Sequence, residues 1–220
     1  IYLLPSNFVE YTKSIIYSIG FGSNFYFHFS SQQYGAESGL LVPLLHTWSL
    51  SVEEQFYILF PIILLITFKY LKEYLLTIFF ILAILSLLIA DWGSKNYPSA
   101  TFYLLHTRIW ELLAGSILAY FEINLGHRSK NKILNLILPS VGIFLVLYSV
   151  IFFDDKIFHP SFYTIPSIIG VCIIIWFSYE KELVTKILSS RLFVGVGLIS
   201  YSLYLYHYPI FAFARIKDND

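Results

Sequence analysis

Charged residues are scarce in this chain of 220 residues, where they make up 13% of the composition, about half the share found in an ordinary soluble domain. The 14 basic and 14 acidic residues cancel to a formal net charge of zero. A chain without excess positive charge has no electrostatic footprint for a phosphate backbone, so nucleic acid is not expected as a partner.

Sulfur is almost absent as well. The one cysteine, Cys172, lies in an apolar run, and a single thiol excludes both an internal disulfide and a cysteine metal cluster. No metal site is predicted either. Four of the six histidines have no partners at metal-ligand spacing, namely His28, His106, His127 and His159. The chain contains no methionine and opens on Ile1 without a signal-peptide pattern, so we expect an internal fragment of a longer protein.

Hydrophobic residues are what the chain has in excess, at 57% of the composition, with aromatic residues at 20%. They are bunched into stretches of about 17 to 22 residues, long enough to cross about 30 Å of hydrocarbon. This pattern excludes a soluble enzyme and predicts an all-α, polytopic transmembrane helix bundle in a lipid bilayer. About six spans are expected, at residues 44–68, 74–90, 102–121, 133–153, 161–178 and 192–213.

The loops between these spans alternate in basic character. One set carries Lys69 and Lys72, then three cations at 128–132, then three at 181–191, whereas the loops at 91–101 and 154–160 have one lysine each. The positive-inside rule places the basic set in the cytoplasm, so the first span is expected to run from outside to inside.

The first 43 residues do not read as an ordinary span. The apolar stretch Ile15–Phe29 is short and is broken by Gly20 and Gly22. We interpret it as an interfacial or re-entrant segment on the outer side, which is tolerated only where protein covers its free backbone groups. No linker or long repeat interrupts the chain, so residues 1–220 are expected to form a single membrane domain.

Polar groups gather where the first span begins. Ser51 and Glu54 have capping-box spacing, which gives Glu54 a structural explanation. Glu53 points about 100° away from Glu54 and is left as a functional candidate, because a charge near a span is costly. His46 is a candidate proton acceptor or hydrogen-bond donor, and the alternative is an interfacial histidine with a hydrated ring.

A second cluster opens the third span. Arg108 and Glu111 lie three residues apart on one helical face, which allows an ion pair and lowers the cost of placing either in a membrane. The pair is a candidate site element, and a purely structural salt bridge is the alternative. Gly115, with Ala114 and Ala119, predicts close helix packing.

The last span carries the third cluster. Ser200, Tyr204 and His207 share a helical stripe, but Ser200 and His207 would lie about 10 Å apart along the axis. A direct pair of a serine nucleophile and a histidine base is therefore not expected. His207 is a candidate site residue, and the alternative is an interfacial histidine among tyrosines. All three clusters fall at outer ends of spans, which predicts a shared, partly water-filled cavity that opens outward.

Three sequence runs resemble signature blocks of the acyltransferase 3 family, which comprises integral-membrane O-acyltransferases of bacterial lipopolysaccharide, peptidoglycan and other glycans. The stretches Leu3–Ser6 and Ser23-Asn24 also resemble the family, so the likeness covers essentially the whole chain. Tyr206 and Tyr208 stand where the family often has tryptophan. The three runs are residues 46–57, 108–115 and 199–209.

The resemblance implies a reaction in which an acyl-CoA, in the first place acetyl-CoA, donates its acyl group to a hydroxyl of a cell-envelope polysaccharide or lipid-linked glycan. It implies no bound cofactor and a location in the bacterial cytoplasmic (inner) membrane. Family members have about ten membrane helices, and an early helix carries the main catalytic histidine near an arginine. The resemblance implies that this region and further C-terminal helices lie outside the given sequence, so this fragment alone is expected to be inactive. The supporting site residues would be His46, Glu53, Arg108, Glu111 and His207.

Two other classes remain open. A transporter or flippase would also place ionisable groups in an outward-facing polar cavity, but it would form no new ester and would often show inverted repeats, which this sequence lacks. In a noncatalytic membrane scaffold, the polar blocks would bind partner helices, and Glu53→Gln would change assembly rather than a product.

Overall fold

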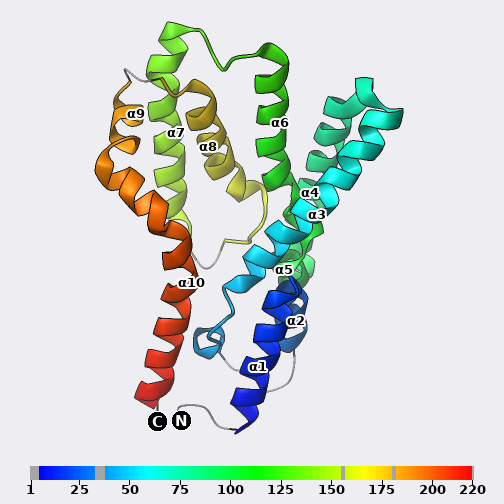
Figure 1. Ribbon diagram of the computed structural model, residues 1–220, viewed down its shortest axis with the longest axis vertical. Helices are drawn as coiled ribbons and strands as arrows, with labels where there is room; N and C mark the ends of the chain where they lie inside the picture. The colour runs from blue at the N-terminus through cyan, green and yellow to red at the C-terminus, as the bar shows by residue number, and fades with distance from the viewer. Residues whose placement is uncertain (1–4, 33–37, 155–156, 180–181, 220) are drawn as a thin grey trace. The chain divides into compact units, whose positions relative to one another are not determined.

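A computed structural model describes residues 5–32, 38–154, 157–179 and 182–219 (Figure 1). Within these ranges the chain forms ten α-helices and four 3-10 helices, with no strand. The chain divides into two compact units, one formed by residues 1–61, 103–105 and 196–220 and the other by residues 62–102 and 106–195. Helices α3 and α10 contribute residues to both units, as do α5 and η3, whose ends next to residue 104 lie in the first unit.

The first unit begins with a helical hairpin. Helices α1 (Pro5–Ile19) and α2 (Ser23–Ser30) pack against each other (Figure 1). Phe21 has a φ of 55°, a left-handed conformation that reverses the chain between them. The amides of Gly20 and Gly22 close this turn by donating to the carbonyls of Ile16 and Tyr17. The hairpin coincides with the segment predicted to be interfacial or re-entrant, and its depth in a membrane stays a prediction.

Besides residues 103–105 and the loops, the rest of the first unit comes from three helical segments. They are the 3-10 helix η1 (Gly39–Leu41), the beginning of α3 (Thr47–Tyr70) and most of α10 (Arg191–Asn219). Because α3 begins at Thr47, Ser51 lies inside the helix and cannot be its cap. The predicted capping box is therefore wrong, and the Ser51 hydroxyl instead lies 2.7 Å from that of Ser23.

The second unit is a set of packed helices. Helix α7 packs against α8, α4 packs against α6, and α6 also contacts α8 (Figure 1). The long helices are α4 (Leu75–Asn96), α6 (Ile109–Leu125), α7 (Lys132–Phe152) and α8 (Ile165–Phe177), and the short ones are α5 (Pro98–Tyr103), α9 (Leu183–Leu188), η2 (Lys72–Tyr74), η3 (Leu105–Thr107) and η4 (Phe162–Thr164).

Two glycines bring α7 and α8 close together. A methyl group added to Gly142 would lie 2.7 Å from the Gly170 carbonyl oxygen, and one added to Gly170 would lie 2.7 Å from the Gly142 carbonyl oxygen. Only glycine permits this approach of α7 and α8. The prediction that Gly115 marks close packing is wrong within the described residues, because its added methyl would meet no atom within 4 Å.

Polar side chains satisfy the ends of several helices. Asn131 accepts hydrogen bonds from two amides that open α7. Glu182, only 2% exposed, caps α9 by accepting from the amides of Val184 and Thr185. Gly126 ends α6 in the left-handed region at a φ of 69°.

Length and hydropathy confirm a membrane protein with several spans. Three helical segments are long and apolar enough to cross a membrane, Thr47–Tyr70, Lys72–Asn96 and Lys132–Phe152, and Phe162–Phe177 is a shorter apolar helix. The segment predicted at 102–121 covers the end of α5, η3 and most of α6, and the one predicted at 192–213 lies within α10, but neither α6 nor α10 meets both criteria. The all-α membrane fold is confirmed, and the number of spans stays a prediction.

Candidate active site

His46 is held in an aromatic cage in the first unit. Its ring stacks on that of Tyr208 at 5.3 Å and meets the edges of Tyr204 and His207 at 5.2 and 5.6 Å between centroids. The residue is 7% exposed, and neither ring nitrogen has a hydrogen-bond partner among the described residues. An imidazole that is buried with both nitrogens unpaired is costly in a purely structural position.

The Tyr204 phenol connects α10 to the start of α3. Its hydroxyl donates to the carbonyl oxygen of His46 and lies 2.6 Å from the hydroxyl of Ser49. A phenol has one proton, so Ser49 is the donor in the second contact. These two bonds fix the backbone of His46 and therefore fix the position of its ring.

Within the described ranges, the hydrogen bonds of the His207 ring involve Nδ1 and not Nε2. Its Nδ1 lies 2.8 Å from the Tyr204 carbonyl oxygen and 3.1 Å from that of Leu203. A carbonyl only accepts, so Nδ1 carries a proton and the Nε2 of neutral His207 has an open lone pair. The neighbouring Tyr208 donates to the Gly39 carbonyl at 2.8 Å and holds η1 against α10.

Helix α3 presents two polar faces to the rest of the first unit. Ser49 and Glu53 are one turn apart, and Glu53 lies within electrostatic range of the Tyr204 phenol. The second face consists of Thr47, Ser51 and Gln55, which are also spaced at one-turn intervals.

The second face binds the helical hairpin. The Thr47 hydroxyl donates to Ser23 at 3.1 Å, and the Ser23 and Ser51 hydroxyls lie 2.7 Å apart. Gln55 and Asn24 pair through their amides, with the Gln55 nitrogen donating to the Asn24 oxygen at 2.8 Å. Sequence reasoning assigned no role to this network, although the one-turn spacing of small polar residues on an apolar helix was a usable signal.

The second unit contains the predicted ion pair. The Arg108 guanidinium donates to the Glu111 carboxylate at 3.2 Å, and both side chains are mostly buried, at 16% and 23% exposed. Arg108 precedes α6 as its N-terminal cap residue, and Glu111 lies in the first turn. The guanidinium also lies over the Phe102 ring, 5.2 Å from its centroid. A cation and an anion so placed compensate each other's loss of water.

Sequence reasoning missed His159, which lies in the loop between α7 and α8. Burial lowers the pKa of this imidazole, and the charge of Arg108 lowers it further. The second unit therefore brings His159 into the electrostatic range of the ion pair. Only its position in a short loop beside a predicted span could have suggested this, because its partner is distant in sequence.

The predicted site residues thus fall into two groups. His46, Glu53 and His207 lie together in the first unit, and Arg108 and Glu111 lie together in the second. Their roles, and the shared outward cavity that would unite the two groups, stay predictions.

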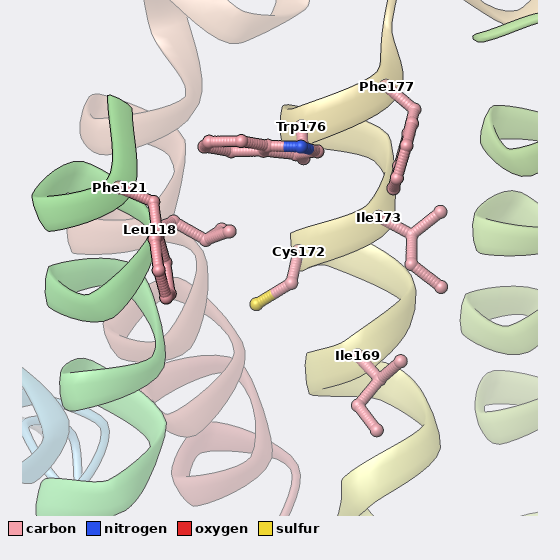
Figure 2. Close-up of a pocket in the computed structure, with 7 residues that line it drawn as sticks. All are labelled: Leu118, Phe121, Ile169, Cys172, Ile173, Trp176 and Phe177. Carbon is pink, nitrogen blue, oxygen red and sulfur yellow. The ribbon is translucent and has the colours of Figure 1, made fainter. Parts of the chain in front are cut away.

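A separate apolar groove lies in the second unit between α6 and α8, with a volume of about 220 Å³. Figure 2 shows Leu118 and Phe121 on α6 facing Cys172 and Trp176 on α8. Phe121 and Trp176 meet edge to face at 6.4 Å. The groove holds no carboxylate, imidazole or cation that could carry acyl-transfer chemistry.

Known proteins resemble the whole chain. The family described as an acyltransferase domain matches residues 14–217. The peptidoglycan O-acetyltransferase OatA of Listeria monocytogenes serovar 1/2a is 30% identical over 94% of this chain and 38% of its own length. A putative O-acetyltransferase of Staphylococcus aureus strain COL is 32% identical over 97% of this chain and 37% of its own. The O-acetyltransferase OatA of Staphylococcus aureus strain NCTC 8325 is 30% identical over 96% of this chain and 36% of its own length.

The chain spans less than two fifths of the length of these curated relatives. No solved structure matches it significantly. The family match covers both compact units and contains all three sequence runs that carry the resemblance. On that match, the chain belongs to the acyltransferase 3 family.

Proposed function

We propose that this chain is part of a membrane O-acyltransferase that transfers an acyl group, in the first place acetyl, from an acyl-CoA to a hydroxyl of a cell-envelope glycan. Family membership and relatives named O-acetyltransferases support the reaction class. The bacterial cytoplasmic membrane is the proposed location, because it separates a cytoplasmic acyl-CoA donor from an envelope acceptor.

The observation that carries the proposal is the caged pair of imidazoles in the first unit. Acyl transfer to a hydroxyl needs a proton acceptor held at a fixed position. Neutral His207 offers an open Nε2 lone pair, and the buried His46 beside it has no hydrogen-bond partner on either nitrogen within the described part of the chain. Such a pair is suited to bind the acceptor hydroxyl or a neighbouring catalytic histidine.

The glycan hydroxyl oxygen forms a bond to the acyl carbonyl carbon, and the carbon–sulfur bond of the acyl-CoA breaks. The hydroxyl proton passes to a base, and CoA leaves as the thiolate or, after protonation, as the thiol. We assign supporting roles to His46, Glu53 and His207, which hold the acceptor hydroxyl or the group that takes its proton.

Arg108 and Glu111 are assigned to charge stabilisation. The guanidinium can stabilise the negative charge that develops on the acyl carbonyl oxygen, and Glu111 holds it in a defined orientation. His159, which stays neutral near pH 7 because its pKa is lowered, adds no second positive charge beside that guanidinium.

The test is transfer of label in cells. The complete open reading frame is expressed in bacteria that lack envelope O-acetylation and are fed radiolabelled acetate, and base-labile label is counted in purified glycans. Glu53→Gln removes the candidate carboxylate from α3. Glu122→Gln is the matched control, because Glu122 pairs with Arg128 in the other unit and has no assigned role.

We expect label with the parent protein and with Glu122→Gln, and much less with Glu53→Gln at equal membrane abundance. Equal label for all three proteins would remove Glu53 from the site. The absence of base-labile label from every envelope glycan, with a well-inserted parent protein, would overturn the proposed reaction.

A further inference from the structure

The helical hairpin carries a pocket that the acyl-transfer residues do not use. Its volume is about 430 Å³, within the range of small-molecule sites. Helix α1 contributes residues at one-turn spacing and α2 contributes an aromatic face. The lining residues are Glu10, Lys13, Tyr17, Phe25, Tyr26, Phe29 and Ser30.

A fixed set of polar groups lies on one wall of the pocket. Lys13 donates to the Glu10 carboxylate at 2.7 Å, and the Tyr26 hydroxyl donates to its other oxygen at 2.5 Å. The hydrogen bond from Lys13, and then that from Tyr26, hold the pKa of Glu10 below its usual range. Both charged side chains remain about half exposed, so the ionised carboxylate and the ammonium keep free capacity for a ligand.

Exposed aromatic rings form the other walls. Phe25 is 45% exposed, Phe29 is 64% exposed and Tyr17 is 47% exposed. Tyr17 stacks on Tyr26 with 4.8 Å between ring centroids, which fixes both rings. Rigid rings beside a carboxylate form a surface that is apolar on its faces and polar at one edge.

Packing of the hairpin does not account for the exposed rings of Phe25 and Phe29. The contacts that bury α2 use the opposite side of the helix, where Ser23, Asn24 and Phe27 are 0–2% exposed. Ser23 and Asn24 also make the hydrogen bonds to α3. Glu10, Tyr17 and Tyr26 join α1 to α2, and the hydrogen bonds from the hairpin to α3 come from other residues.

We propose that this pocket binds a sugar unit of the glycan acceptor, a proposal that rests on the proposed function. A sugar ring has apolar C–H faces, which would pack on Phe25 and Phe29, and hydroxyls at its edge, which would donate to Glu10 and accept from Lys13. Glu10 and Lys13 cancel in charge, which favours a neutral, hydroxyl-rich ligand over a phosphate group. The predicted placement of the hairpin on the outer side agrees with an envelope acceptor.

The pocket belongs to the same compact unit as the caged imidazoles. Bonds from Thr47 to Ser18 and Ser23 connect the hairpin directly to the residue that follows His46. A glycan chain held at the pocket would thus be anchored to the element that positions His46, and the pocket acts in binding rather than in the chemical step.

The experiment measures binding and kinetics on the full-length protein in lipid nanodiscs. The probe is a set of soluble peptidoglycan fragments released by a muramidase. The variants are Glu10→Gln and Phe29→Ala, which remove the carboxylate charge and one ring. Phe8→Ala is the matched control, because Phe8 is 57% exposed on α1 and does not line the pocket.

We expect each pocket variant to raise the Kd for the fragments and the acceptor KM by about five-fold or more, because a charge-assisted hydrogen bond or a ring contact is lost. The kcat of the pocket variants should stay unchanged. The Kd, KM and kcat of Phe8→Ala should equal those of the parent. Unchanged Kd and KM in both variants of an active protein would overturn the pocket assignment alone. Fragments that bind the parent and not the variants, without any ester formed, would support the pocket and overturn the proposed reaction.

Discussion

At the residue scale, the position of His46 depends on one phenol. Tyr204 donates to the His46 carbonyl and accepts from Ser49, so it joins α10 to the start of α3 through two hydrogen bonds. Among the described residues, Tyr204 is the one side chain of α10 that donates a hydrogen bond to His46. This hydroxyl fixes the backbone of His46, and the stacked ring of Tyr208 packs against its imidazole.

Tyr204→Phe should lower both stability and transfer. It leaves the His46 carbonyl and the Ser49 hydroxyl without their partner, at an expected cost of about 1–3 kcal/mol. Denaturant unfolding in detergent and glycan acetylation at matched abundance measure the two effects. Tyr201→Phe is the control, because Tyr201 is 59% exposed on the same helix. Equal behaviour of the two variants would contradict the role of the Tyr204 hydroxyl.

Arg108→Lys should reduce glycan acetylation by about ten-fold or more, equivalent to about 1.4 kcal/mol in the transition state. A lysine keeps the charge but lacks the planar, two-pronged donor geometry of the guanidinium. Labelled acetate incorporation measures the effect. Arg128→Lys is the control, because Arg128 also pairs with a glutamate but lies in the loop after α6. Unchanged acetylation at equal membrane abundance would remove Arg108 from the site.

His159 should make the stability fall on acidification. Its folded-state pKa is lowered, so the unfolded chain binds its proton first as the pH falls. The stability contributed by the neutral ring is therefore present above about pH 6.5 and is lost below that value. Unfolding midpoints between pH 8 and pH 5 should fall less steeply for His159→Gln than for the parent. Parallel pH profiles would show that His159 titrates alike in both states.

At the element scale, the contact of α7 with α8 depends on the absence of two side chains. Gly142→Ala should lower the free energy of unfolding by about 1–3 kcal/mol, the typical cost of overpacking. The added methyl would lie 2.7 Å from the backbone of α8, which cannot move aside as a side chain can. Thermal unfolding in detergent measures the loss.

Gly115→Ala provides the matched control for this contact. Its methyl meets open space, and alanine is the better helix former, so its stability should be unchanged or slightly raised. A loss of stability as large as that of Gly142→Ala would mean that helix propensity, and not the close approach, determines the effect.

At the scale of the whole molecule, the alternation of basic loops predicts which loops face the cytoplasm. In a Cys172→Ser background, Asn96→Cys should react with a membrane-impermeant maleimide on intact spheroplasts. Lys130→Cys should react only after permeabilisation, because its loop belongs to the basic set. Gel shifts of the labelled protein measure both. The reverse labelling pattern would invert the orientation and place the imidazole cage on the cytoplasmic side.

Much of the helical framework was predictable from the sequence, because long apolar runs in a nearly uncharged chain have few alternatives to helices that cross a bilayer. The predictions failed where an outcome depended on partners distant in sequence. The start of α3 lies four residues before Ser51, and Ser51 pairs with Ser23 rather than with its own helix. Gly115 and Gly142 look alike in sequence, and only the position of a neighbouring helix distinguishes them.

The sequence predicted which residue types form the candidate site, but it predicted only in part which of these residues lie together. The ion pair of Arg108 with Glu111 follows from local spacing and is present. The contact of His46 with His207 joins opposite ends of the chain, and the sequence supported it only through the expected depth of each group. His159 and the pocket of the hairpin lay outside any local pattern.

The two polar faces of α3 also determine how this segment can change in evolution. Thr47, Ser51 and Gln55 bind the hairpin, while Ser49 and Glu53 lie toward α10. One inserted or deleted residue between positions 47 and 55 would rotate everything beyond it by about 100° and turn both sets of side chains away from their partners. The segment can accept substitutions one at a time, but its length is fixed, and an alignment gap inside it would mark a protein that has lost this site.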